Sequence, residues 1–311
     1  MAAKKFNKKS EIEANITASV IAALEAGTAP WKKSWSCISG GAALRENGLP
    51  YKGFNQFILG MTGRANPYWF TYNKAAELAG CEKNEKGKWI WDDNKGVNEG
   101  ETGEYICFWG KAKPKKGAEP DEKGYMFMKW YKVFNAEQIS GLPAKYDITD
   151  VEEKTPAERD AAAEAYIEAT GAEIRFGGDR AFFSPSQDFI QNPHIEDFVD
   201  PTAYYGTLLH ELVHWTGAEK RLDRDLKNSF GTKDYAREEL CAEMGATFLC
   251  GHLGLEAEPR DDHAQYIASW IKTLKEDKTA LRKACAMAQK AVDYLDAFSE
   301  EEVEEDFKEA A

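Results

Sequence analysis

The feature that most constrains this chain is a short apolar segment, residues 207–215, that contains the pattern His-Glu-x-x-His. The segment holds no Pro or Gly and is followed by Gly217, so we expect a helix that ends near that glycine. Residues four apart share one face of a helix, so the imidazoles of His210 and His214 leave it together. Two imidazoles so placed can bind one Zn²⁺ at about 2.0–2.1 Å. Glu211 lies beside them, where its carboxylate can accept a proton from a metal-bound water.

A second apolar segment, residues 235–249, is expected to form another buried helix and to supply a third ligand. Glu239 and Glu243 are four residues apart and therefore share a face. We expect Glu239 to be the third metal ligand, and Glu243 to orient a ligand histidine from one helical turn further on. Small side chains in the segment permit close approach of the two helices: Ala242, Gly245 and Ala246.

Two alternatives to this assignment remain. Glu238 is the rival ligand, but it points roughly 100° away around the helix and is expected to face solvent. The acidic pair could also be an ordinary solvated face, although apolar and small residues surround both carboxylates.

Composition limits the class of protein. With 311 residues, of which 43% are hydrophobic, the chain is long enough for two domains. No apolar run reaches the roughly 18 residues that a membrane span needs. The six cysteines are scattered and the polar N-terminus shows no secretory signal, so we expect reduced, mostly buried thiols and a cytoplasmic location. For Cys241 and Cys250, core packing is expected rather than metal binding.

Charge divides the chain into two parts. Residues 1–150 carry 22 Lys and Arg against 18 Asp and Glu, a net charge of +4, whereas residues 151–311 carry 18 against 35, a net charge of −17. This asymmetry predicts two units with different partners.

The N-terminal unit combines aromatic rings with lysines. Seven of the nine Trp precede residue 150. Rings of this kind can stack on bases at ~1–3 kcal/mol each, while cations follow the phosphates, which suits single-stranded nucleic acid. Candidate contacts are Trp31, Lys32, Lys33, Trp35, Lys52, Lys111, Lys113, Lys115 and Lys116.

The alternative is that these rings belong to the core, which we expect for Trp69, Trp109, Phe127 and Phe134; for Trp31 and Trp35 both interpretations stay open. A net charge of +4 predicts weak, salt-sensitive and sequence-tolerant binding.

The expected fold class is α+β. We expect an N-terminal domain over residues 1–141, a linker over 142–156, a C-terminal domain over 157–298 and a disordered acidic tail over 299–311. The expected helices are 10–25, one ending near 170, the two described above, 261–275 and 279–298. The expected strands are 105–111 and 125–135, joined by a basic loop, and a hairpin over 180–190 whose Pro185 indicates a sheet edge. Such an edge can pair with an extended peptide, or it can be a hairpin without a partner.

Five motifs in order resemble the ArdC-like antirestriction proteins of plasmids and phages: APWKKSW (29–35), YKGFNQ (51–56), FFSPSQDFI (182–190), TLLHELVHWTG (207–217) and YAREELCAEMGA (235–246). The resemblance spans residues 10–296. It implies a single-stranded-DNA-binding N-terminal domain, a zincin-like metallopeptidase domain and a bacterial protein that protects incoming DNA from restriction. It also implies that His210, His214 and Glu239 bind zinc, that another divalent metal can replace the zinc, and that Glu211 is catalytic. Phe183 stands where the family is expected to have Tyr more often.

Three functions are therefore compared. The first is a DNA-tethered zinc metallopeptidase acting on an unidentified protein, such as a restriction protein or another DNA-bound protein. The second is a single-stranded-DNA-binding protein whose zinc only stabilises the fold. The third is a protease that cuts proteins crosslinked to DNA.

Overall fold

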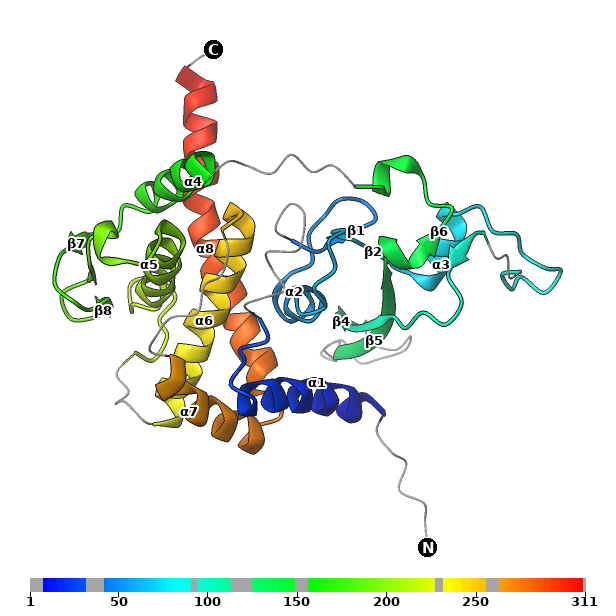
Figure 1. Ribbon diagram of the computed structural model, residues 1–311, viewed down its shortest axis with the longest axis horizontal. Coiled ribbons are helices and arrows are strands. Elements are labelled where there is room, and N and C mark those ends of the chain that lie inside the picture. The colour runs from blue at the N-terminus through cyan, green and yellow to red at the C-terminus, as the bar shows by residue number, and fades with distance from the viewer. Residues whose placement is uncertain are drawn as a thin grey trace, which may run out of the picture.

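The computed structural model describes residues 8–31, 42–90, 94–112, 125–148, 156–226, 232–255 and 263–309. Figure 1 shows the larger sheet in one half of the molecule and a bundle of helices with a smaller sheet in the other, with α2 (Gly53–Gly60) between them. The mixture of helices and sheets confirms the predicted α+β class.

The N-terminal half is built on a four-stranded sheet of order β1-β2-β5-β4. Its strands are β1 (Leu44–Arg45), β2 (Tyr68–Thr71), β4 (Glu104–Lys111) and β5 (Met126–Asn135). β1 and β2 are parallel and the other pairs are antiparallel, so β4 and β5 form the predicted long hairpin. Smaller elements complete this half: α3 (Tyr72–Leu78), the paired β3 (Gly96–Val97) and β6 (Ile139–Ser140), and 3₁₀ turns at Ala136–Gln138 and Ala144–Tyr146.

The outer edge of β4 is covered by a side chain of α2. Asn55 donates its amide to the carbonyl of Cys107 and accepts the Cys107 amide, both at 2.8 Å, as a neighbouring strand would. Trp69 and Phe134 are buried as expected, and Phe127 is half-buried. The expectation that Trp109 is buried is wrong. Trp109 is 47% exposed, and its neighbour Phe108, on the opposite face, is 50% exposed, so this end of the hairpin extends beyond the core.

The C-terminal half contains five helices and a small sheet within the described ranges. The helices are α4 (Pro156–Ala169), α5 (Pro201–Thr216), α6 (Lys233–Leu253), α7 (His263–Glu276) and α8 (Ala280–Glu309). The sheet has the order β7-β9-β8, from Ile174–Phe176, Phe189–Asn192 and Phe182–Ser184, and a 3₁₀ turn follows at Ile195–Asp197. β8 pairs antiparallel with β9 and is an edge strand, as the hairpin prediction required.

The sequence predicts a disordered tail over residues 299–311. This prediction is wrong for residues 299–309, because α8 continues as a helix to Glu309. Glutamate is a good helix former, and extending an existing helix avoids the cost of nucleating a new one. α8 packs against α6 over its earlier turns, which supplies that nucleus.

The first helix of the chain joins the C-terminal half. α1 (Lys8–Glu25) lies along α7 (Figure 1), and its Val20 and Leu24 belong to the same buried cluster as α5 and α6. A partly buried ion pair reinforces the contact, with Glu13 accepting a hydrogen bond from Nε of Arg282 at 2.8 Å. The main hydrophobic core is therefore built from both ends of the sequence.

α5 and α6 pack closely at Gly245. A β-carbon at this position would lie 2.7 Å from Cγ2 of Val213 on α5, closer than carbon atoms approach without displacement. The glycine thus sets the distance between the helix that carries the His-Glu-x-x-His pattern and the helix that carries Glu239. No helix in the described ranges has the length and apolar character of a membrane span.

We predict that Gly245→Ala destabilises the protein by ~1–3 kcal/mol, because overpacking outweighs the better helix propensity of alanine. Gly206→Ala is the matched control on α5, where a β-carbon meets nothing within 4 Å. The control should be neutral or stabilising by up to ~1 kcal/mol. Urea unfolding in excess chelator measures both; equal shifts of the same sign would contradict the packing account.

Candidate metal centre

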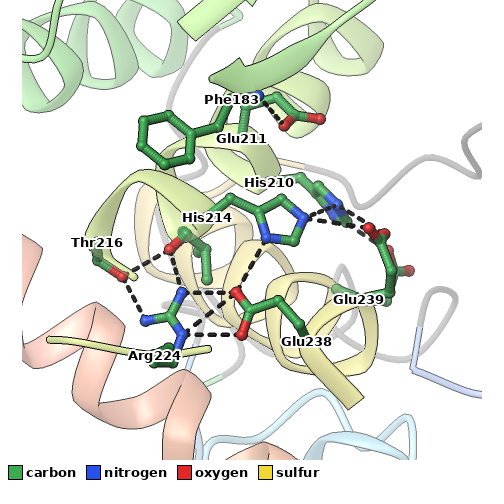
Figure 2. Close-up of polar contacts among 10 residues, drawn as sticks. Phe183, His210, Glu211, His214, Thr216, Arg224, Glu238 and Glu239 are labelled. Atoms are coloured by element: carbon green, nitrogen blue, oxygen red, sulfur yellow. Dashed lines mark hydrogen bonds and ion pairs between the residues drawn. The ribbon is translucent and has the colours of Figure 1, made fainter. Parts of the chain in front are cut away.

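The start of α5 is fixed locally. The Asp200 side chain accepts the amide of Ala203 at 2.9 Å, and Pro201 occupies the first helical position, where its missing N–H costs nothing. The helix then runs without interruption through His210 and His214. Their imidazole rings lie 4.9 Å apart on the side of α5 that faces α6 (Figure 2).

α6 begins at a similar cap, with the Thr232 hydroxyl accepting the amide of Tyr235. The buried Glu239 follows and faces both histidines. The structure thus brings together the three residues that the spacing predicted: His210, His214 and Glu239.

Distances among their ligand atoms fit a single ion. Nε2 of His210 lies 3.2 Å from Nε2 of His214, and the Glu239 oxygens lie 3.5 Å and 3.6 Å from these two nitrogens. Donors on a tetrahedral ion with bonds of ~2.1 Å lie about 3.4 Å apart. In the described part of the chain, this group contains no fourth His, Cys, Asp or Glu. Three protein ligands are the set found in catalytic zinc sites, which keep one position open.

Glu239 is held ionised. Burial raises the pKa of its carboxyl, but the hydrogen bond to His210, the nearby His214 and a hydrogen bond from Tyr235 outweigh burial and lower the pKa to about 2. Sequence reasoning missed Tyr235, although it lies four residues before Glu239 and thus on the same helix face. Its hydroxyl is also 3.3 Å from that of Tyr266.

The expectation that Glu238 faces solvent is wrong. Its carboxylate is buried and lies 3.1 Å from Nδ1 of His214. Arg224 donates to both of its oxygens, at 2.9 Å and 3.1 Å, and caps α5 by donating to the carbonyl of Val213 (Figure 2). Burial raises the pKa of Glu238, but His214 and Arg224 outweigh it and lower the pKa to about 2. This arrangement favours a proton on Nδ1 of His214, which leaves Nε2 for a metal. Arg224 lies in a loop, so no local pattern predicted it.

The structure places Glu243 beside the other histidine. Its Oε2 lies 3.7 Å from Nδ1 of His210, and its Oε1 accepts the indole N–H of Trp31 at 3.0 Å. Trp31 is 0% exposed, so its ring offers no face to a nucleic-acid base, and its candidacy as a DNA contact is wrong. The reason is that its surroundings combine an apolar core with a carboxylate acceptor.

Glu211 is buried, and its Oε2 accepts the backbone amide of Phe183 at 3.0 Å. β8 is therefore joined to α5 through its outward-facing amide (Figure 2). Any residue except proline can supply this amide at position 183, so the replacement of an expected Tyr by Phe does not affect the contact.

The other candidate DNA contacts fall into two groups. Lys52 forms an exposed ion pair with Asp293 of α8 at 2.7 Å, and Lys111 is exposed at the end of β4. The remaining candidates lie outside the described residues: Lys32, Lys33, Trp35, Lys113, Lys115 and Lys116.

Sequence reasoning missed an exposed aromatic surface on the hairpin. Phe108 pairs across the strands with Lys129, and Phe127 and Tyr131 are two residues away on the same face. The ring of Phe108 lies 6.3 Å from each of the other two rings, and Nζ of Lys129 lies 5.1 Å from the centre of Phe127. These four residues are called the hairpin face below. Alternation along the two strands was the signal that could have identified it.

Two models of known protein families match parts of this chain. One, described as a zincin-like metallopeptidase, matches residues 161–287, which include the metal centre. The other, described as the N-terminal domain of anti-restriction factor ArdC, matches residues 10–134.

Three curated proteins are similar in sequence to this chain. Two DNA primase TraC proteins of Escherichia coli are each 39% identical over 92% of this chain, and the chain spans only 27% and 20% of their lengths. The uncharacterized protein y4eC of Sinorhizobium fredii is 34% identical, with 92% of both sequences covered.

Two solved structures match nearly the whole chain, both of the antirestriction protein ArdC from plasmid R388 and both 37% identical. The metal-free structure has a TM-score of 0.75 and covers 93% of this chain and 98% of that one. The Mn(II)-bound structure has a TM-score of 0.71, with 92% and 97% covered. The full-length likeness, the two family models and the three convergent ligands lead to one conclusion: the chain belongs to the ArdC-like antirestriction protein family.

Proposed function

We propose that this protein is a zinc metallopeptidase tethered to single-stranded DNA, which protects incoming plasmid or phage DNA from restriction in the bacterial cytoplasm. The observation that carries the enzymatic part is the convergence of His210, His214 and Glu239 at ion-sized spacing, with Glu211 next to His210. The Mn(II)-bound ArdC structure supports a divalent metal, and two imidazoles with a carboxylate favour zinc.

A bound divalent ion supplies Lewis acidity, which lowers the pKa of water and polarises a carbonyl group. The chain's own residues supply the rest. Glu211 takes the proton of the attacking water and passes it to the leaving amine. The Phe183 amide holds the Glu211 carboxylate in place, while Glu238 holds His214. The edge strand β8 is the proposed place for an extended peptide, because it lies against α5.

Binding of DNA is proposed for the hairpin face. Two of its three aromatic rings are exposed, Phe108 at 50% and Tyr131 at 42%, the third, Phe127, is half-buried, and Lys129 lies among them. Exposed rings beside cations can stack on bases of any sequence while the cations contact phosphates. The hairpin face takes the place of Trp31 among the proposed DNA contacts. In the sequence, Lys111 ends β4, and Lys113, Lys115 and Lys116 come shortly after it.

A second function is favoured by one observation. His210, Glu211 and Glu239 are all buried, as in metal sites that only stabilise a fold. In that case the protein protects DNA by coating it. The three-ligand set supports the enzyme instead, because structural zinc sites use four protein ligands. A protease specific for proteins crosslinked to DNA has the same metal centre and differs in its substrate.

We expect purified protein to contain one equivalent of zinc, and His210→Ala and Glu239→Ala to lose it, because two remaining ligands bind weakly. His252→Ala is the matched control, an exposed histidine on α6. Metal analysis and binding of oligo(dT) are measured on the same samples. DNA binding that survives the loss of metal shows that the two activities are separable, whereas unchanged zinc in His210→Ala would refute the proposed site.

Glu211→Gln should keep its metal and lose peptidase activity by at least ~100-fold, because an amide cannot accept the proton. Cleavage of casein and self-cleavage, each with and without single-stranded DNA, provide the assay. Glu219→Gln, an exposed glutamate just after α5, is the control. Undiminished proteolysis in Glu211→Gln would contradict the proposed mechanism.

The same variant separates the proposed functions. If it lacks proteolysis but still protects a plasmid during transfer, protection comes from DNA coating. Stimulation of self-cleavage by single-stranded DNA favours the crosslink protease.

Phe108→Ala should weaken binding of oligo(dT) by about 5- to 150-fold, which corresponds to the loss of ~1–3 kcal/mol of stacking. Phe176→Ala is the matched control, since Phe176 is 51% exposed on β7 in the C-terminal half. Fluorescence anisotropy at several salt concentrations measures both variants. Equal affinity of Phe108→Ala and Phe176→Ala would remove the hairpin face from the DNA site.

A further inference from the structure

A hydrogen bond connects the N-terminal part of the chain to the metal centre. Trp31 lies in the region that matches the ArdC N-terminal domain, and Glu243 in the region that matches the zincin-like metallopeptidase. The indole Nε1 of Trp31 donates to Oε1 of Glu243 at 3.0 Å, and both side chains are buried. A hydrogen bond between two buried groups is directional, so it fixes how the carboxyl group of Glu243 is oriented.

The second oxygen of Glu243 faces a ligand. Oε2 lies 3.7 Å from Nδ1 of His210, whose Nε2 is one of the three converging donor atoms. A carboxylate at Nδ1 fixes the ring orientation and favours the tautomer whose Nε2 lone pair is available to a metal. Because the two oxygens belong to one rigid group, a donor that holds Oε1 also sets the direction of Oε2.

The Trp31 ring is itself fixed by packing from two directions. Trp270 of α7 meets it edge-on, with ring centres 5.8 Å apart, and Phe57 of α2 lies at 6.1 Å. Rotation of the indole away from Glu243 would require displacement of these rings. The donor is therefore held in place before any metal binds.

We infer that Trp31 is a positioning residue for the metal centre: its indole N–H orients Glu243 toward Nδ1 of His210, so the N-terminal part of the chain contributes to metal affinity. The inference rests on the metal site of the proposed function, and it does not depend on peptidase activity or on DNA binding. Glu238 and Arg224 perform the equivalent task for His214 from within the C-terminal half.

The test compares Trp31→Phe with Trp69→Phe in the full chain. Both changes truncate a fully buried indole to a phenyl ring, but only the first deletes the donor to Glu243, because Trp69 lies in the N-terminal sheet. Affinity for Zn²⁺ and for Mn²⁺ is measured by competition with a chromophoric chelator. Trp31→Phe should weaken binding by about tenfold, and Trp69→Phe by less than about twofold. Unfolding in excess chelator separates this effect from lost stability of the metal-free protein.

Glu243→Gln completes the test and should weaken metal binding to a similar extent, because a neutral amide is a poorer partner for Nδ1 of His210. Adding Trp31→Phe to Glu243→Gln should cause little further loss, since the tryptophan acts through the glutamate. If Trp31→Phe does not fold, the metal affinity of Glu243→Gln decides instead, and a metal affinity equal to that of the wild type overturns the inference. Equal losses in Trp31→Phe and Trp69→Phe also overturn it. Wild-type protein that binds neither ion refutes the proposed metal site itself, whereas normal wild-type binding with unaffected variants refutes only the role of Trp31.

Discussion

The contact between α5 and α6 is the constraint on which the metal centre depends. Two candidate donor nitrogens, 3.2 Å apart, come from one helix, and each lies 3.5–3.6 Å from one of the two carboxylate oxygens of Glu239 on the other helix. Metal–ligand bonds tolerate deviations of only about 0.2 Å, so the separation of the helices must be set more finely than loose apolar packing allows. Val213 against the bare backbone of Gly245 provides such a limit, since stiff branched side chains yield little.

The same contact buries an unusual amount of negative charge. Glu211, Glu238, Glu239 and Glu243 all lie below the surface on these two helices. A buried carboxylate is tolerated only when it has donors or positive partners. Here the donors come from separate parts of the chain: the β8 backbone, the Arg224 loop, Tyr235 with the two histidines, and Trp31. Each acid thereby receives a fixed orientation, so the shell around the ligands is ordered by the surrounding fold.

The features that the sequence could predict are those set by residues close together in the chain; contacts between distant segments could not be predicted. His210, His214 and Glu239 were found because one helical turn relates the two histidines and an apolar pattern marks both helices. The β4–β5 hairpin and the β8 edge were found from alternation and from Pro185. Glu238 was misjudged because an angle on a helical wheel does not reveal an arginine from the preceding loop. Trp109 was misjudged and Trp31 was left open, since local composition cannot tell which ring a distant helix will cover.

Docking of α1 on the C-terminal helices also bears on how the protein is made. The Glu13–Arg282 pair joins residues 269 apart in the sequence, and the Thr17 hydroxyl reaches the carbonyl of Lys278 across 261 residues. At synthesis rates of roughly 5–20 residues per second, the ribosome needs on the order of tens of seconds between these segments. α1 therefore emerges long before its binding surface exists. A nascent chain must keep α1 soluble until α7 and α8 have been synthesised, and only then can Val20 and Leu24 join the main hydrophobic core.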